Sequence, residues 1–173
     1  TLGFGNYGTA NAELFITKNI SRTSYVGGML RHLSSQGGIK DLVLDDKYSN
    51  TSLDVTYGVR ERNLSWNIDL GVKNQMYNWY GLPTENIVFD ETTIKSIDSK
   101  QSYNTIALGG KVDFKASFFS GADMQFKHFS DGLNSSENRF FIKPNFDFQL
   151  LNQKINTDFV FDYVGGSFDR MLN

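Results

Sequence analysis

The sequence predicts an all-β chain, an antiparallel up-and-down transmembrane β-barrel with about eight or nine strands visible. The first observation is strict alternation, clearest in Phe146-Asp147-Phe148-Gln149-Leu150, where successive side chains point to opposite faces. A helical period persists over three turns nowhere in the chain. The second observation is the regular rhythm of alternating segments, which fall near 9–20, 24–35, 51–61, 64–79, 102–115, 117–130, 139–151 and 154–166, with a further candidate at 1–7.

The third observation is that two kinds of connection take turns along the chain. Short links are expected at 21–24, 61–63, 115–117 and 152–154. Long polar loops are expected at about 36–50, 82–101 and 131–138. Tight turns at one edge and long loops at the other are typical of outer-membrane barrels. We therefore treat residues 1–173 as a single barrel segment with its long loops on the outer side.

Alternation divides these strands into two faces of different chemistry. We expect the apolar face to contact lipid, through Leu14, Ile16, Val55, Trp66, Ile68, Leu70, Ile106, Leu108, Met124, Phe126, Phe146, Phe148, Phe159 and Phe161. We expect the polar face to line a lumen, through Glu13, Asp54, Arg60, Asp69, Lys73, Lys111, Asp113, Asp123, Lys127, Lys143, Asp147, Asp158 and Asp162. Mixed charges of this kind fit either a packed network of ion pairs or the wall of a wide aqueous channel.

A soluble sandwich or lipocalin-like barrel would satisfy the same division with the apolar face inside. Strands of about 12–15 residues are long for a soluble domain and suit a tilted membrane span. Aromatic residues also gather near strand ends, as expected of interfacial girdles. They are Tyr25, Trp66, Phe118 and Phe119 at the short turns, and Tyr77, Trp79, Tyr80, Tyr103, Phe129, Phe140 and Phe141 at the long loops.

Composition narrows the function classes. The 173 residues include no cysteine and only two histidines, so neither a cysteine site nor a histidine metal cluster is expected, and no cofactor is predicted. A net charge of −2 gives no footprint for nucleic acid. The first residue is Thr and no signal peptide is visible, which predicts a mature chain or an excised piece. The last strand runs outward, which favours a section of a larger barrel.

Five blocks of the chain resemble a known class of barrels. They are LGFGNYGTANAELF (2–15), RHLSSQGGIKD (31–41), NQMYNWYGLP (74–83), GGKVDFKASFFSGADMQFKHFSD (109–131) and FDFQLLNQKINTDFVFDYVGG (146–166). These blocks resemble the barrel region of Bacteroidota outer-membrane proteins, the TonB-dependent-receptor-like barrels, although neither a plug domain nor a TonB box is seen.

This resemblance implies location in the outer membrane of a Gram-negative bacterium. It also implies a role in transport or uptake, or as a barrel subunit of an outer-membrane complex, rather than as an enzyme. The implied partners are outer-membrane lipid or lipopolysaccharide and other outer-membrane proteins or lipoproteins. A structural or adhesive barrel that binds partners through loops 36–50 and 82–101 is an alternative.

A second alternative is an enzyme built on His32 and Ser34. The stretch His32-Leu33-Ser34-Ser35-Gln36-Gly37 is similar to the His-x-Ser-Asn-x-Gly motif of outer-membrane lipid A 3-O-deacylases, with Ser35 in place of Asn. Residues i and i+2 of a strand share a face, so the imidazole could activate the hydroxyl. The acid of such a triad would have to be Asp45, Asp46 or Asp54. The plainer interpretation is a polar strand end that enters a glycine-rich loop.

Overall fold

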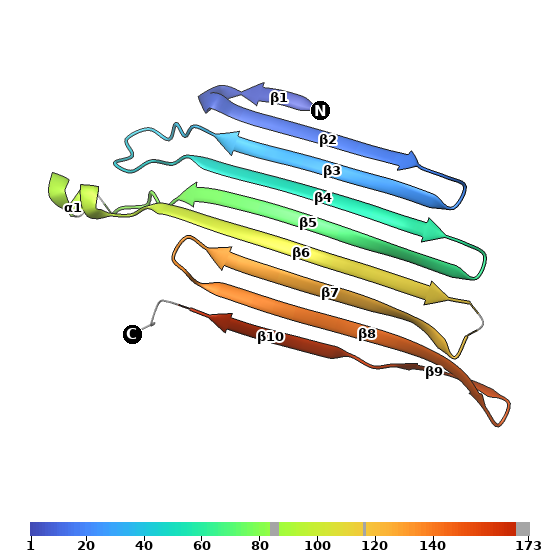
Figure 1. Ribbon diagram of the computed structural model, residues 1–173. Helices are drawn as coiled ribbons and strands as arrows, with labels where there is room; N and C mark the ends of the chain where they lie inside the picture. Colours follow the sequence, from blue (N-terminus) through green and yellow to red (C-terminus); the bar gives the residue numbers. More distant parts are fainter. Residues whose placement is uncertain (84–86, 116, 169–173) are drawn as a thin grey trace.

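The computed structural model describes residues 1–83, 87–115 and 117–168, which form one antiparallel sheet of ten strands (Figure 1). In chain order the elements are β1 (Leu2–Gly5), a 3-10 turn (Asn6–Gly8), β2 (Thr9–Asn19), β3 (Ser24–Ser35), β4 (Tyr48–Arg60), β5 (Leu64–Asn78), α1 (Glu91–Ser96), β6 (Lys100–Phe114), β7 (Phe119–Asp131), β8 (Ser136–Leu150), β9 (Gln153–Asp158) and β10 (Phe161–Ser167). The all-β, up-and-down prediction is confirmed.

The sheet is open, so the predicted closure into a barrel is not present among the described strands. Each strand pairs with its neighbour in sequence from β1 to β8, and both β9 and β10 pair with β8. β1 lies at one edge and β10 at the other, as Figure 1 shows. The count is ten rather than eight or nine because segment 1–7 contains a short strand and segment 154–166 is divided in two.

Pro144 explains the division between β9 and β10. The pairing register with β8 continues unchanged from Asn145↔Asp158 to Ile142↔Phe161, so both strands lie on one line. Phe159 between them donates its backbone N–H to the Pro144 carbonyl oxygen at 3.1 Å. Proline has no N–H to return that bond, so the ladder is interrupted there without a change of direction. The predicted strand 154–166 is therefore continuous in register although it is broken in hydrogen bonding.

The predicted long loop at 131–138 is wrong. β7 ends at Asp131 and β8 begins at Ser136, so a tight turn joins them. The Asp131 carboxylate accepts the backbone N–H groups of Leu133 and Ser135 at 2.8 Å each, and Asn134 adopts a left-handed φ of 64°. Asp, Gly and Asn favour such turns as strongly as they favour long loops, and composition alone did not separate the two.

The other two long connections are present, and each has local structure. In the β3–β4 loop, the Asp46 carboxylate accepts the backbone N–H groups of Gly38 and Ile39, at 2.9 Å and 2.8 Å for its Oδ2 atom. The loop between β5 and β6 contains α1, whose N-cap Asp90 accepts the Thr93 backbone N–H at 2.9 Å. Both connections lie at the same end of the sheet as the tight β7–β8 turn, and the other short turns lie at the opposite end (Figure 1).

The strands are staggered in one sense across the sheet. One row of paired residues runs from Leu14 in β2 through Val72 in β5 to Gly165 in β10. It lies five residues from the short-turn end of β2 but twelve from that end of the β9–β10 line. The distance from this row to the long-loop end of the strand falls from five residues in β2 to two residues in β10. A strand rises by about 3.3 Å per residue, and neighbouring strands lie about 4.8 Å apart. The stagger therefore corresponds to an angle of about 15–35° between the strands and the line perpendicular to the two edges formed by the turns and loops.

A hydrophobic core is nearly absent from this sheet. Among the described residues, Ala122 is the one buried hydrophobic residue, at 7% exposure. Chains of this length normally bury most of their apolar surface against a second layer. Here neither face of the sheet is covered by another layer of the described chain. The composition of each face therefore indicates the surroundings that its side chains favour.

Candidate functional site: the two faces of the sheet

The strand register places the predicted apolar and polar residues on opposite faces. Residues that pair across strands share a face, and one such row reads Ile16, Gly28, Val55, Leu70, Leu108, Phe126, Phe140 and Tyr163. The next row towards the short turns reads Lys18, Val26, Tyr57, Ile68, Gly110, Met124, Ile142 and Phe161. We call this side the apolar face and the opposite side, which carries the charges, the polar face.

The apolar residues form a band that follows the stagger of the strands. In β5 the band covers Leu64 to Val72, and in β6 it covers Ile106 to Phe114. In β3 the band lies in rows closer to the long loops than it does in β8. In β8 it extends from Phe140 to Leu150 and reaches the short turn that leads to β9. The band therefore runs parallel to the edges formed by the turns and not perpendicular to the strands.

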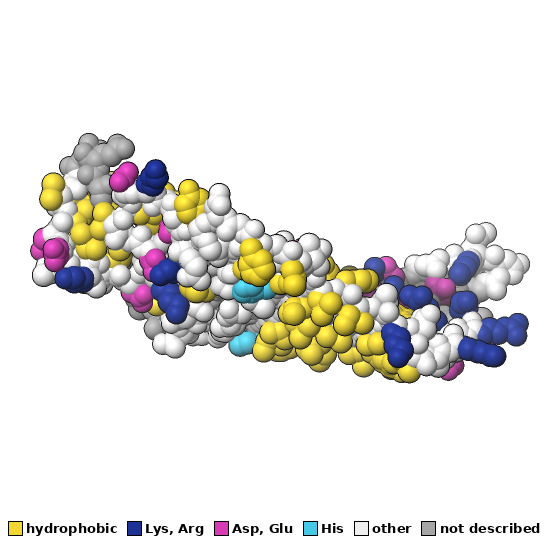
Figure 2. All heavy atoms as spheres, turned by 90° about the horizontal axis from the view of Figure 1, so that it is seen from above, with side chains coloured by type: hydrophobic (Ala, Val, Ile, Leu, Met, Phe, Trp, Pro, Cys, Tyr) yellow, Lys and Arg dark blue, Asp and Glu magenta, His cyan; other side chains and the backbone are white. Residues whose placement is uncertain are grey.

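Side chains in this band are open to the surroundings. Ile68 and Leu108 are each 50% exposed, and Phe161 is 56% exposed. Figure 2, which views the molecule from its β1 side, shows hydrophobic side chains gathered near the middle, with Lys and Arg side chains towards both ends. Soluble monomers rarely expose a contiguous apolar patch of this extent, and such a patch marks a contact with another apolar phase or partner.

Aromatic rings gather at the short-turn end of the apolar face. Phe146 contacts Phe118, Phe119 and Phe159 with ring centroids 5.5, 5.6 and 5.8 Å away. Farther along the same face, Trp66 lies 5.6 Å from Tyr57. This part of the predicted aromatic arrangement agrees with the register.

Other aromatic residues predicted for the girdles lie on the polar face. Tyr77 and Tyr103 stack with centroids 5.7 Å apart, Tyr103 and Phe129 stack at 5.7 Å, and the two tyrosine hydroxyls lie 3.2 Å apart. Their register partners share the side of Glu13 and Lys73, so these rings stabilise the polar face near the long loops. Phe141 and Tyr25 also belong to this side. The position of these residues near strand ends did not indicate on which face of the sheet they lie. The face depends on whether a residue is an even or an odd number of positions away from a residue of known face.

The polar face pairs most of its charges with one another. Arg139 holds Asp162 through two hydrogen bonds, from Nε at 2.8 Å and from the terminal nitrogen at 2.5 Å. Further ion pairs on this face are Arg31–Asp54 at 3.4 Å, Lys111–Asp113 at 3.7 Å, Lys143–Asp158 at 2.9 Å and Lys154–Asp147 at 3.3 Å. Lys111 and Asp113 are two residues apart within β6, and the other pairs join neighbouring strands. Such pairing fits a hydrated wall of mixed charge.

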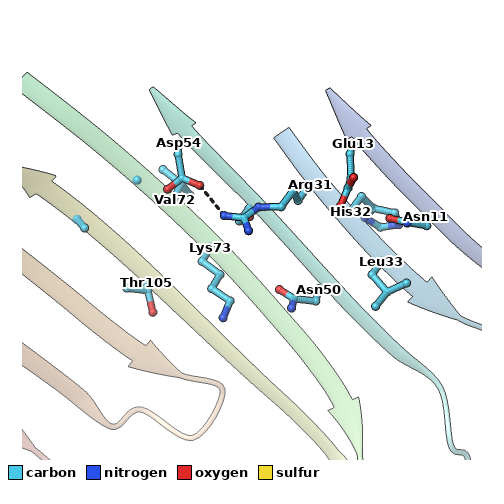
Figure 3. Close-up of a pocket in the computed structure, with 13 residues that line it drawn as sticks. Asn11, Glu13, Arg31, His32, Leu33, Asn50, Asp54, Val72, Lys73 and Thr105 are labelled. Carbon is cyan, nitrogen blue, oxygen red and sulfur yellow. Dashed lines mark hydrogen bonds and ion pairs between the residues drawn. The ribbon is translucent and has the colours of Figure 1, made fainter. Parts of the chain in front are cut away.

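A shallow hollow lies on the polar face between β2 and β6. The small residues Gly71 and Ala107 are part of its lining. The side chains of Glu13, Arg31 and Lys73 also line it (Figure 3). Figure 3 shows the Arg31 side chain turned towards Asp54. Asn50 and Lys73 lie on neighbouring strands of the same hollow. The hollow combines both signs of charge with amide and hydroxyl groups, which suits polar solutes in general.

Nearer the short turns the polar face packs tightly at Gly58. The Tyr25 ring covers this glycine, and the Arg60 guanidinium lies over the same ring at 4.5 Å. A Cβ atom at position 58 would lie 2.4 Å from the Tyr25 ring, so a larger residue there requires the ring to move. The sequence predicted Arg60 on this face but did not indicate its aromatic partner, because Tyr25 and Arg60 are far apart in the chain.

His32 and Ser34 lie on the apolar face, just beyond the apolar band. The His32 Nε2 atom is 3.0 Å from Ser34 Oγ, and Nδ1 is 2.8 Å from Thr51 Oγ1. The predicted pairing of imidazole and hydroxyl is therefore present.

The acid of the predicted triad is not supplied by any of the three candidates. Asp54 pairs with Arg31 on the polar face, Asp45 pairs with Lys47 at 2.9 Å, and Asp46 is engaged by the backbone of its own loop. Thr51 occupies the position that would orient the imidazole. The second histidine, His128, lies on the same face with its Nδ1 atom 2.8 Å from Asn138 Oδ1.

No grouping of three or more His, Cys, Asp or Glu side chains that could hold a metal ion occurs in residues 1–83, 87–115 and 117–168. In the same residues, no helix is both long and apolar enough to cross a membrane. No family model matches the chain, and neither a curated protein nor a solved structure matches it.

Proposed function

We propose that this chain is a section of the wall of a transmembrane β-barrel in a bacterial outer membrane. Its apolar face would contact lipid acyl chains, and its polar face would line the lumen. The barrel would act in transport or uptake, as a TonB-dependent-receptor-like barrel, or as a barrel subunit of an outer-membrane complex.

The observation that carries this proposal is the exposed apolar band that follows the strand stagger. Its length of about nine residues in β5 and β6 matches the roughly 9–11 residues of a tilted membrane strand. The tilt of about 15–35° approaches the roughly 35–45° of strands in such barrels. In a soluble sandwich the apolar surface need not run parallel to the edges formed by the turns. A bilayer imposes this alignment, because its apolar layer lies between two parallel polar surfaces.

The chemistry of the polar face supports a hydrated lumen. Its charges are of both signs and several of them pair across strands, and the hollow beside Arg31 and Lys73 includes amide and hydroxyl groups in its lining. A lumen of this kind would admit or hold polar solutes without strong selection by charge sign. Osmotic swelling of protein-containing vesicles in sugars of graded size would distinguish an open lumen from a filled one.

Single-cysteine labelling tests the assignment of the two faces, because the chain has no cysteine of its own. Asp69→Cys and Leu70→Cys are matched variants, since these residues are adjacent in β5 and lie on opposite faces. Each is labelled with bimane and reconstituted in vesicles containing lipids with a nitroxide on the acyl chain. We expect strong quenching for Leu70→Cys and weak quenching for Asp69→Cys.

Two outcomes contradict the proposal. Equal quenching at both positions, or none at either, means that the apolar face does not contact acyl chains. A protein that stays monomeric in water without detergent and vesicles, with Leu70→Cys inaccessible to label, means that the apolar face is covered by protein instead.

The His32–Ser34 pair favours a second candidate function, hydrolysis of an acyl ester of a lipid. If Nδ1–H donates to Thr51, Nε2 accepts the proton of Ser34 Oγ. The serine oxygen would attack the acyl carbonyl while its proton moves to Nε2. The alcohol of the ester would leave with that proton, and water would then release the fatty acid from Ser34.

A fluorophosphonate probe tests this second candidate directly. We expect wild-type labelling to be lost in Ser34→Ala and retained in Ser35→Ala, since Ser35 points to the polar side and hydrogen-bonds to the Tyr7 carbonyl. Absence of labelling in the wild-type protein in vesicles rejects the hydrolase and leaves the barrel proposal unaffected.

A further inference from the structure

A continuous row of uncharged polar side chains crosses the apolar face at the long-loop side of the band. Register pairs connect it strand by strand from β3 to β10. We call this row the neutral belt, and its members are His32, Thr51, Asn74, Asn104, Ser130, Ser136 and Ser167. His128 and Asn138 widen it on β7 and β8, one row nearer the band.

Hydrogen bonds hold the belt together across strands. The Asn74 side-chain amide donates to Asn104 Oδ1 at 2.7 Å, and both residues are exposed. His128 Nδ1 and Asn138 Oδ1 lie 2.8 Å apart. Each amide keeps further donors and acceptors, because a side-chain amide offers two N–H groups and two lone pairs. The belt therefore presents an ordered line of both donors and acceptors to whatever lies outside it.

Charge is absent from this line, whereas the opposite face carries charges in the row that lies next to the belt on its band side. On the band side of the belt, the adjacent row of the polar face carries four charged residues among eight, and it reads Glu13, Arg31, Ser52, Lys73, Thr105, Phe129, Glu137 and Gly166. On the loop side, the adjacent row carries one charged residue among six, and it reads Asn11, Leu33, Asn50, Gln75, Tyr103 and Asp131. None of the seven belt residues is Lys, Arg, Asp or Glu. The contrast separates two possible surroundings, since phosphate groups are recognised by Arg and Lys, and hydroxyl groups are matched by amides and hydroxyls.

We propose that the neutral belt binds the sugar headgroups of membrane glycolipids through their hydroxyl groups. The inference rests on the proposed membrane orientation, because the belt continues the apolar band on the side where acyl chains would end. It adds the partner chemistry, a neutral glycan surface anchored in the membrane, and it places the contact on Asn74 and Asn104 at the centre of the row.

Vesicles of defined composition test this inference. The protein is reconstituted in phosphatidylcholine alone, with a neutral digalactosyl diacylglycerol, or with anionic phosphatidylglycerol at the same mole fraction, and its unfolding midpoint is measured. We expect the glycolipid to raise the midpoint by several degrees and the anionic lipid to leave it unchanged. Free digalactose in solution should have no effect, because the belt acts on headgroups held at the membrane surface.

Two variants locate the effect. Asn74→Leu/Asn104→Leu removes the central amides of the belt, and we expect the glycolipid shift to be lost. Asn50→Leu is the matched control, since Asn50 lies at the same height in β4 on the polar face and should retain the shift.

The outcomes separate this inference from the function on which it rests. If the wild-type protein does not insert into any vesicle, both proposals fail. If it inserts and the glycolipid gives no shift, or an equal shift in the double variant, the belt inference alone fails. A larger shift with phosphatidylglycerol means that phosphate is the recognised group, which also overturns it.

Discussion

The two faces of this sheet are built on the same strands, yet they satisfy their side chains in different ways. Phe161 and Asp162 are neighbours in β10. Phe161 is 56% exposed and lies 6.3 Å from Phe140, whereas Asp162 is held by two hydrogen bonds from Arg139. Charged side chains of the polar face pair with one another, whereas side chains of the apolar band contact other apolar side chains and remain exposed.

This difference indicates which face needs an external partner. Each Å² of apolar surface left in water costs roughly 25 cal/mol, and the apolar band is exposed on every long strand. Ion pairs on the polar face are stable in contact with water, because exposed charges remain hydrated. An acyl-chain environment on one side and water on the other satisfies both faces without any change in the strands.

The largest expected effect comes from a charge placed in the middle of the apolar band. Ile68→Arg puts a guanidinium at the centre of the β5 segment, where the side chain is 50% exposed. In a bilayer the loss of unfolding free energy should be about 2–4 kcal/mol, measured by urea unfolding in vesicles.

Gln125→Arg is the control for that variant, because Gln125 is exposed on the polar face of β7. We expect a change within about 0.5 kcal/mol, as for ordinary surface substitutions. If both arginines cost the same small amount, the apolar face is not in lipid and the distinction between the faces collapses.

The next comparison uses two glycines. Gly58→Val forces the Tyr25 ring away from the polar face, since a Cβ there would lie 2.4 Å from it, and should cost about 1–3 kcal/mol. At Gly110 on the apolar face, a Cβ would lie at an ordinary contact distance of 3.6 Å from the Asn67 carbonyl oxygen, so Gly110→Val should be nearly neutral. Combining Gly58→Val with Tyr25→Ala should recover part of the loss. Equal costs for the two single variants would mean that Tyr25 is not a rigid cover.

Much of the sheet could be predicted from alternation alone. Segment 24–35 matches β3 at both ends, and the division of the strands into two faces follows from parity once the register is known. The His32–Ser34 contact followed from the i, i+2 rule on the same basis. Local patterns of this kind depend on neighbours within one strand.

Features that depend on several strands could not be predicted in the same way. The neutral belt joins one residue from each of seven strands, and no segment of the sequence contains more than one of its members. The same holds for the stack of Tyr77, Tyr103 and Phe129, which the sequence located near the long loops without indicating a face. Register between strands is set by turn geometry and by the whole pattern, so it cannot be obtained from one strand at a time.

A smaller effect distinguishes the faces by their response to salt. Asp162→Asn removes the ion pair with Arg139, and we expect a small loss of stability that disappears in about 1 M salt, where charges are screened. Phe161→Leu removes ring contacts with Phe140, and its loss should not depend on salt. Unfolding midpoints at low and high ionic strength give both values. Salt dependence of the same size for both variants would contradict the difference between the faces.

The smallest effect on overall stability is expected in the β3–β4 loop, which belongs to neither face. Backbone N–H groups, that of Ile39 first and that of Gly38 next, hold the pKa of the Asp46 carboxyl below its ordinary value of 3.8. A carboxyl whose pKa is lower in the folded loop stabilises that loop above pH of about 4, and the contribution is lost as the pH falls through the folded value.

Asp46→Asn should therefore open this loop at neutral pH and leave the strands intact. Hydrogen exchange at the Gly38 and Ile39 amides gives the measurement. Exchange at neutral pH should be faster in the variant than in the wild-type protein, and the difference should shrink as the wild-type carboxylate is protonated in acid. Strand amides should exchange at the same rate in the two proteins, because the Asp46 carboxylate accepts its hydrogen bonds from amides of its own loop. Faster exchange in β3 and β4 as well would mean that Asp46 supports the sheet and that the loop is part of its stability.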